Sequence, residues 1–297
     1  MPARPRTPHV LDAPSNLGLR PPEPGVVPGC YKAPGVLRDL GLLGRIGAVD
    51  AGVVTPPRYR PDWTPGTVRN EAALADYSRQ LADRVAAILE AGRLPVVLGG
   101  DCSIVIGIAL ALRRRGRFGL AYLDGLDYRH DSEEVGAAGG ESLALVTGLG
   151  GLLAELEGTG PSLRPTDTVV LGLRPGDEYA EEAAAAGLHL IDAPTVGADP
   201  AAAVQRTLEI LESTDLDGFW VHVDADVIDG GLLPAVDSPE PDGLTFDDLA
   251  TVLGRLLASP RAVGMDLAIY DPDLDPGLQG GRRLTDALVA AFAARGA

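Results

Sequence analysis

Short runs of hydrophobic and β-branched residues alternate along the chain with longer segments whose apolar positions recur at helical spacing. The short runs predict strands at Ile46–Val49, Pro95–Leu98, Phe118–Asp124, Thr168–Leu171, Leu188–Ile191, Phe219–Asp226 and Ala262–Leu267. The longer segments predict helices near Thr67–Glu90, Ile104–Arg115, Asp177–Ala186, Pro200–Ser213, Thr245–Ala258 and Arg283–Ala294. Apolar strands separated by amphipathic helices indicate an α/β fold of three layers (αβα), with a mainly parallel sheet of about seven or eight strands.

The domain organisation follows from where this alternation begins. Residues 1–35 are rich in Pro and Gly and show no periodicity, so we expect an extended N-terminal arm that lies on the domain. After residue 35 no Pro/Ser linker divides the chain, which predicts a single α/β domain over residues 36–297.

Charge and cysteine content narrow the classes of function. The chain has 42 acidic and 25 basic residues and a formal charge of −17, which disfavours nucleic acids and anionic membranes and favours a cationic small molecule or a metal ion. Two cysteines cannot form a disulfide framework or a Cys-rich zinc site.

The apolar stretches, such as Ile104–Leu112, are far shorter than the roughly 20 residues of a membrane span. The first six residues lack the apolar run of a secretory signal, so we expect a cytoplasmic protein.

Acidic residues cluster where the predicted strands end. The strand at 118–124 ends in Asp124, and the strand at 219–226 carries His222, Asp224 and Asp226 at alternate positions. Residues two apart in a strand face the same side, so these three side chains project together. In a parallel sheet, ligands bind beyond the carboxyl ends of the strands, which is where we expect the chemistry.

The negative charges of several carboxylates at one edge of a sheet require a compensating positive charge or protonation. Two like charges 4 Å apart repel by ~4 kcal/mol at an effective dielectric of about 20, so the group requires a cation, an arginine or protons. Divalent metals suit carboxylate-rich sites, and imidazole adds a ligand for first-row metals. The alternative is that each Asp caps a helix or a turn. Cys102, after Gly99-Gly100-Asp101, remains open as a metal-facing thiolate, a nucleophile or a small buried hydrophobic residue.

Taken in order, these segments resemble the ureohydrolase family, which includes arginase, agmatinase and formimidoylglutamase. The family carries Gly-Gly-Asp-His-Ser, Asp-Ala-His-x-Asp, Ser-Phe-Asp-x-Asp-x-x-Asp-Pro, a Gly-Gly-Leu-Thr segment and Glu-Val-Asn-Pro. This chain has Gly99-Gly100-Asp101-Cys102-Ser103, Asp124-Gly125-Leu126-Asp127-Tyr128, His222-Val223-Asp224-Ala225-Asp226-Val227-Ile228-Asp229-Gly230, Asp242-Gly243-Leu244-Thr245 and Ile269-Tyr270-Asp271-Pro272. The resemblance covers roughly residues 30–295 and implies an arginase-like fold and a homo-oligomer (a dimer, trimer or hexamer).

The resemblance also implies a metal site that this chain alters. Family members bind two manganese ions, and a bridging hydroxide attacks a guanidinium or similar carbon. Asp124, Asp224 and Asp226 stand at ligand positions and are kept, whereas Cys102 and Leu126 stand where the family has histidine ligands. A full two-manganese site is therefore not expected. The resemblance implies at most one divalent ion, manganese or similar, or none.

Three other family positions are also changed. The remaining Asp ligand position holds Tyr128, unless a one-residue deletion places Asp127 there. Ile269 replaces the acid that grips guanidinium, and a buried apolar group cannot satisfy guanidinium donors. In the loop after residue 130, where the family keeps another His, the chain has Glu141 and its neighbours.

We therefore predict a divergent ureohydrolase-fold enzyme that acts on a C–N bond of a small, cationic, nitrogen-containing substrate other than plain guanidinium. The predicted catalytic residues are Asp124, His222, Cys102 and Asp226, and the predicted substrate-binding residues are Asp127, Tyr128, Glu141 and Ile269. The predicted metal ligands are Asp124, Asp224 and Asp226, with His222 or Cys102. The alternative is a non-catalytic pseudo-ureohydrolase that binds a metabolite or supports an oligomer.

Overall fold

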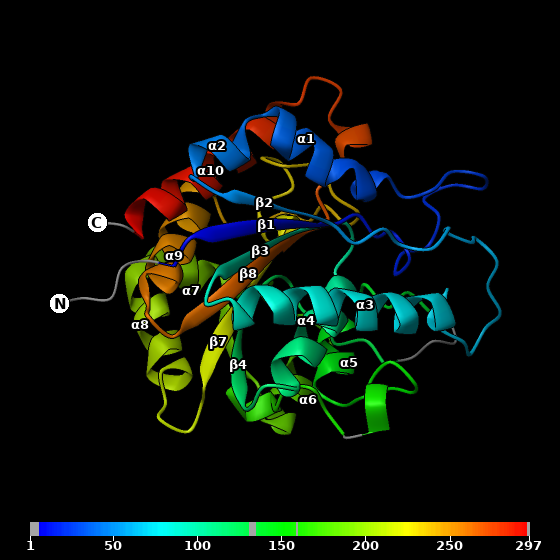
Figure 1. Ribbon diagram of the computed structural model, residues 1–297, viewed down its shortest axis with the longest axis horizontal. Helices are drawn as coiled ribbons and strands as arrows, with labels where there is room; N and C mark the ends of the chain where they lie inside the picture. The colour runs from blue at the N-terminus through cyan, green and yellow to red at the C-terminus, as the bar shows by residue number, and fades with distance from the viewer. Residues whose placement is uncertain (1–5, 131–134, 159, 296–297) are drawn as a thin grey trace.

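One sheet of eight strands runs through the computed structural model, which describes residues 6–130, 135–158 and 160–295 (Figure 1). The strands are β1 (Pro8–Ala13), β2 (Val49–Val53), β3 (Leu94–Gly99), β4 (Phe118–Leu123), β5 (Thr168–Leu173), β6 (His189–Asp192), β7 (Gly218–Asp224) and β8 (Ala262–Ala268). Their order is β2-β1-β3-β8-β7-β4-β5-β6, and each neighbouring pair is parallel. The predicted α/β fold is confirmed.

Helices cover both faces of the sheet. They are α1 (Ala33–Asp39), α2 (Leu42–Arg45), α3 (Glu71–Glu90), α4 (Ile104–Arg113), α5 (Ser142–Val146), α6 (Ala180–Ala186), α7 (Ala193–Ala198), α8 (Pro200–Leu211), α9 (Phe246–Ala258) and α10 (Gln279–Ala294). One apolar cluster joins the sheet to α1, α2 and α7–α10, and a second joins its other face to α3–α6. Within the described chain, no helix combines the length and the apolar character that crossing a bilayer would require.

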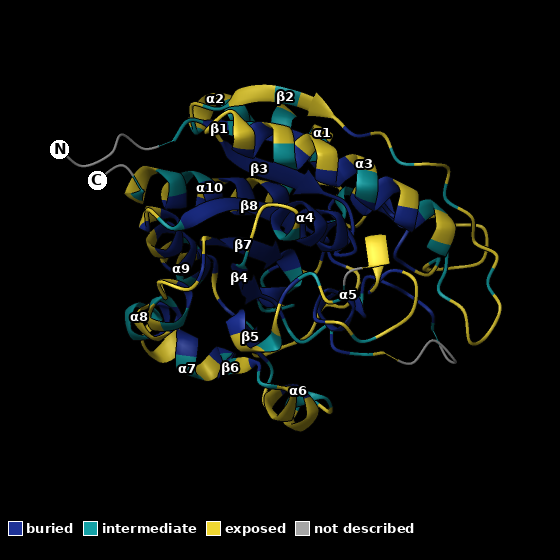
Figure 2. Cartoon of the chain, turned by 60° about the horizontal axis from the view of Figure 1, so that its bottom comes forward, coloured by how far each residue is buried: buried dark blue, intermediate teal, exposed yellow. Residues whose placement is uncertain are grey.

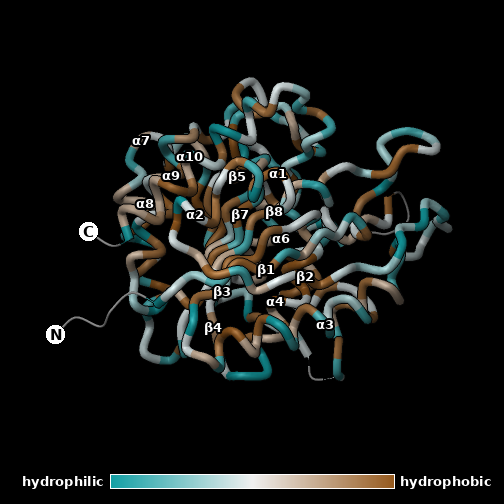
Figure 3. Tube along the Cα trace, turned by 45° about the horizontal axis from the view of Figure 1, so that its top comes forward, coloured by the Kyte–Doolittle hydropathy of each residue, from teal (hydrophilic) through white to brown (hydrophobic). Residues whose placement is uncertain are grey.

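Burial follows the position of each strand in the sheet. The inner strands β3, β8, β7 and β4 are buried at every residue, whereas the edge strand β2 is mostly exposed (Figure 2). The hydrophobic colours of Figure 3 concentrate on the inner strands and α4, and the hydrophilic colours on surface loops. A polar side chain on an inner strand is therefore unusual and needs a partner or a function.

The main differences from the predicted elements lie before residue 54. Residues 8–13, which the sequence analysis placed in an extended arm, form β1 between β2 and β3. The strand predicted at 46–49 begins only at Val49, after the short helices α1 and α2, which were not predicted. The surrounding Pro and Gly residues obscured both patterns, and in β1 the polar residues His9 and Asp12 interrupt the apolar run.

The turn after β3 is fixed by close backbone packing. Gly100 accepts a hydrogen bond from the Ile269 amide (2.7 Å), and the next amide, of Asp101, donates to the Ser15 carbonyl (3.0 Å). The Asp101 carboxylate is fully buried and accepts from the Ser15 hydroxyl (2.9 Å). This packing holds the following residue, Cys102, against the carboxyl end of the sheet.

We expect Gly100→Ala to destabilise the protein by about 1–3 kcal/mol or more, because the added methyl group would overlap the carbonyl oxygen and nitrogen of Ser15. Urea unfolding of the chelator-treated protein measures the effect. Gly125→Ala is the matched control, since a methyl group there meets no atom within 4 Å, and its free energy of unfolding should stay within about 0.5 kcal/mol. Equal effects of the two substitutions would contradict the packing argument.

Candidate metal centre and active site

Four neighbouring strands bring the chemistry-bearing residues to one edge of the sheet. β3, β8, β7 and β4 are adjacent and parallel, so their carboxyl ends lie together. Cys102 follows β3, Asp224 ends β7 and Asp124 follows β4, where its amide donates to the Leu171 carbonyl of β5 (3.1 Å). Residues separated by more than one hundred positions in sequence thus meet at the carboxyl edge.

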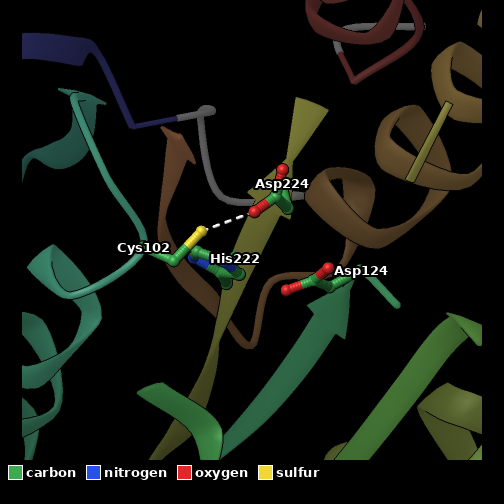
Figure 4. A group of neighbouring side chains, drawn as sticks. All are labelled: Cys102, Asp124, His222 and Asp224. Carbon is green, nitrogen blue, oxygen red and sulfur yellow. Dashed lines mark hydrogen bonds between the residues drawn. The ribbon is translucent and has the colours of Figure 1, made fainter. Parts of the chain in front are cut away.

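These residues form a buried cluster with His222. Ligand atoms of Cys102, Asp124, His222 and Asp224 all lie within 4.8 Å of one another (Figure 4). The Cys102 thiol donates to Oδ2 of Asp224 at 2.5 Å. Within the described residues, Oδ2 of Asp124 and Nε2 of His222 are buried without a hydrogen-bond partner. We call these four residues the Cys–His–Asp cluster.

A second buried carboxylate orients His222. Sheet register places His222 of β7 between Tyr122 of β4 and Asp266 of β8. Its Nδ1 lies 2.7 Å from Oδ2 of Asp266, whose other oxygen accepts from Nε1 of Trp220 at 2.6 Å. The imidazole stacks on the Tyr122 ring, with centroids 4.4 Å apart. Burial alone would lower the pKa of His222, but the Asp266 carboxylate raises it overall.

Sequence analysis assigned no role to Asp266. The signal was available, because a charged residue in the middle of a buried parallel strand requires a partner. Only the register of β7 against β8 shows that this partner is His222.

The structure places Asp127, and not Tyr128, toward the cluster. Asp127 accepts from the Tyr122 hydroxyl (2.9 Å) and the Ser142 hydroxyl (3.2 Å), and the charge of Asp124 acts on it. The Tyr128 side chain is 1% exposed and packs in the apolar cluster beneath α3–α6. The substrate contact predicted for Tyr128 therefore lacks support from its position.

Burial also changes the pKa values of the other acidic side chains of the site. Burial, followed by the charges of neighbouring carboxylates, raises the pKa values of Asp127, Asp224 and Asp226 well above their usual range. Burial first, and then the charge of Asp224, likewise raises the pKa of the Cys102 thiol. Three carboxyl groups and a thiol with raised pKa values form an environment that a cation would stabilise.

Two adjoining cavities lead from this edge toward the surface. The first, of about 150 Å³, is lined by Asp124, Gly125, Leu126, Asp127, Arg174, Asp177, Asp226, Ser238 and Glu240. The second, of about 290 Å³, shares Leu126, Asp127, Asp177, Ser238 and Glu240 and adds Arg20, Arg129 and Tyr179, among others. Carboxylates outnumber arginines around the first cavity. Its chemistry suits a small cationic ligand.

Arg174 lines the first cavity and is held there by backbone carbonyls. Its guanidinium donates to the backbone carbonyls of Asp226 (2.7 Å), Gly172 (3.1 Å) and Val227 (3.3 Å). It therefore braces the short helix at Ala225–Val227, which presents the Asp226 side chain. The Asp226 amide in turn donates to Oδ1 of Asp224 (2.8 Å).

Two other predicted substrate-binding residues, Ile269 and Glu141, are not among the residues that line these cavities, although Gly140, next to Glu141, lines the second. Ile269 is 4% exposed and packs in the apolar cluster beneath α1 and α7–α10. Its φ of 68° lies in the left-handed region, which is strained for a β-branched residue. Glu141 is buried immediately before α5. Substrate contacts by Ile269 and Glu141 remain predictions.

Comparison with known proteins identifies the family. The sequence profile described as the arginase family matches residues 28–295. The chain belongs to the arginase family. It is 27% identical over 310 residues to an arginase of Agrobacterium fabrum, covering 98% of this chain and 92% of that protein. It is 30% identical over 281 residues to a formimidoylglutamase of Nocardia farcinica, covering 90% and 85%. The crystal structure of Bacillus caldovelox arginase superposes with a TM-score of 0.84 at 23% identity, covering 98% of each chain.

The donor set of this arginase-family member offers ligands to a divalent ion but differs from the family motifs. Members of the family normally bind divalent metals such as manganese. The buried, unpaired Nε2 of His222 and Oδ2 of Asp124 are donors available to one cation. In the neighbouring loop Asp127 faces the cavity with Asp124 and Asp226, whereas Leu126 supplies no donor atom and Tyr128 is packed among apolar side chains. The residues present therefore differ from the two-manganese donor set of the family motifs at Cys102 and Leu126.

Proposed function

We propose that this arginase-family chain hydrolyses a C–N bond of a small cationic nitrogen compound and uses one divalent ion. The observation that carries the proposal is the Cys–His–Asp cluster, whose two unpaired buried donor atoms lie next to an acidic cavity. The names of its relatives, arginase and formimidoylglutamase, describe enzymes of this general reaction class.

The side chains of the site have two roles, metal binding and substrate binding, according to their positions. Asp124, Asp224 and His222 would hold the ion, which when bound supplies a Lewis acid and makes water a nucleophile at neutral pH. Asp127 and Asp226 line the cavity and present carboxyl oxygens to the cationic nitrogen of the substrate. In the reaction, the water oxygen bonds to the substrate carbon, the C–N bond breaks and the leaving nitrogen takes up a proton.

Substrate selectivity follows from the same cavity. Its carboxylates favour cations, and its volume of about 150 Å³ fits a small polar group. Ile269 stands where the family motif has the acid that grips guanidinium, and one relative is a formimidoylglutamase, so amidine-type or formimino-type nitrogen compounds are the expected class. A cytoplasmic location and homo-oligomerisation remain part of this proposal.

A substrate panel tests the function. Chelator-treated protein is supplied with Zn²⁺, Co²⁺ or Mn²⁺ and assayed for ammonia, amine or urea release from amidine, formimino, guanidino and ureido compounds. We expect metal-dependent release from an amidine or formimino compound, and loss of this release in Asp226→Asn. Asp76→Asn, an exposed substitution on α3, is the control that should retain full activity. No turnover with any of the three metals would support the non-catalytic alternative.

A further inference from the structure

We propose that this chain binds a single zinc-type divalent ion through the four side chains of its Cys–His–Asp cluster. The assignment rests on the proposed function for the role of the ion, but it concerns the identity of the metal and its ligands. It includes Cys102, which stands where the family motif has a histidine, and His222, which stands where that motif has a serine. The centre is therefore chemically different from a manganese pair held by imidazoles and carboxylates.

The donor atoms of the four side chains converge on one point. One atom from each of the four side chains lies within 4.8 Å of the others, and all four residues are buried. Two donors bound 2.0–2.3 Å from one zinc ion lie about 3–4 Å apart, which is close to this spread. The Cys102 thiol donates a hydrogen bond to Asp224, and its proton would leave when the sulfur binds an ion.

His222 has the supporting contacts of a metal ligand. Its Nδ1 is engaged by Asp266, so Nε2 is the nitrogen left for the cluster, and that atom is buried without a partner among the described residues. A metal-bound histidine typically donates its other N–H to a carboxylate, which fixes the tautomer and the ring orientation. Trp220 holds the second oxygen of Asp266, so the orientation of the ring is itself supported. Asp266 and Trp220 are thus positioning residues.

The chemistry of the donors selects the metal. A thiolate and an imidazole favour zinc or cobalt over manganese, which prefers oxygen ligands. Zinc accepts Cys, His and Asp in a tetrahedral set and tolerates a fifth ligand. Asp124 belongs to the cluster and also lines the first cavity. An ion held by the cluster would therefore remain accessible to water or substrate from that cavity.

Metal retention is the first test. Chelator-treated full-length protein is dialysed against equimolar Zn²⁺ and Mn²⁺, washed free of unbound metal and measured by elemental analysis. We expect one zinc per chain and no retained manganese. Two manganese ions per chain, or no retained metal, would overturn the proposal.

Cobalt spectroscopy identifies the ligands. The Co²⁺-loaded protein should show a sulfur-to-cobalt charge-transfer band in the near ultraviolet, and Cys102→Ser should abolish it. Cys30→Ser is the matched control, because Cys30 is also buried but lies outside the cluster, and the band should persist. Absence of the band in the unmodified protein, or its persistence in Cys102→Ser, would overturn the assignment of the Cys102 sulfur as a metal ligand.

The positioning role of Asp266 is tested by a separate measurement. Asp266→Asn should weaken Zn²⁺ affinity about 10–100-fold while the cobalt band keeps its position, because the ligands themselves are unchanged. Affinity unchanged from that of the unmodified protein would remove Asp266 from the proposal.

Failure of this inference and failure of the proposed function give different results. One bound zinc with the cysteine-dependent band but no turnover leaves the metal centre in place and rejects the hydrolase. Turnover supported by two manganese ions rejects the zinc-type centre and keeps the hydrolase.

Discussion

Asp224→Asn should lower kcat/KM by about 10³-fold or more and should also change stability in opposite directions with and without metal. The catalytic loss follows because the substitution removes a charged donor from the cluster, and electrostatic stabilisation by a bound ion is worth several kcal/mol. Steady-state kinetics on the best substrate of the panel, at saturating metal, measures this loss.

The effect on stability arises from buried like charges. Burial and the charges of Asp124 and Asp127 raise the pKa of Asp224, and each unit of such a shift corresponds to about 1.4 kcal/mol. In chelator, we expect Asp224→Asn to raise Tm by about 2–4 °C for each kcal/mol of repulsion that it removes. The asparagine oxygen can still accept the Asp226 amide that Asp224 accepts now.

With metal present, we expect the unmodified protein to have a higher Tm than Asp224→Asn, the reverse of the order in chelator. The unmodified protein should gain stability as ion binding adds to folding, whereas Asp224→Asn should gain little. Thermal scans of both proteins with chelator and with Zn²⁺ give the four required values. A lower Tm for Asp224→Asn in chelator, combined with unchanged turnover, would show that Asp224 is a structural residue of the metal-free chain. Asp76→Asn should change none of these values.

The sequence patterns predicted the inner strands well because full burial leaves a clear signal. Continuous apolar runs at 95–98 and 168–171 correspond to β3 and β5, with small differences at their ends. β1 gave no comparable signal, because His9 and Asp12 interrupt its apolar run, it begins with Pro8 and a Pro/Gly-rich segment follows it. Its burial comes from pairing with β2 and β3, which a local pattern does not reveal.

The candidate site could be predicted only in part from the sequence. Alternation along one strand placed His222 beside Asp224, and the ends of parallel strands brought Asp124 to the same edge. The structure gives Asp226 a neighbouring position on the cavity wall. The partnership of His222 with Asp266 depends on the register between β7 and β8, which a long loop and α9 separate along the chain, and no local pattern specifies that register.

His222→Phe should destabilise the chelator-treated protein by about 3–5 kcal/mol, the largest stability effect expected for a substitution in the cluster. Phenylalanine keeps an aromatic ring to stack on Tyr122 but leaves the fully buried Asp266 carboxylate with only the Trp220 donor. The cost is that of a buried, incompletely paired charge. Urea unfolding measures it, in the absence of metal so that ion binding does not contribute.

A double-mutant cycle separates this charge effect from a simple loss of packing. Asp266→Asn in the His222→Phe background should restore much of the lost stability, because asparagine is neutral and its oxygen can still accept from Trp220. The coupling energy between the two positions should be about 1–3 kcal/mol. His130→Phe is the matched control: His130 also contacts a carboxylate, Glu182 at 2.9 Å, but at the exposed surface, where such a pair contributes at most about 1 kcal/mol. If His222→Phe and His130→Phe have equal effects, or if Asp266→Asn brings no recovery, His222 and Asp266 do not act as a buried ionic pair.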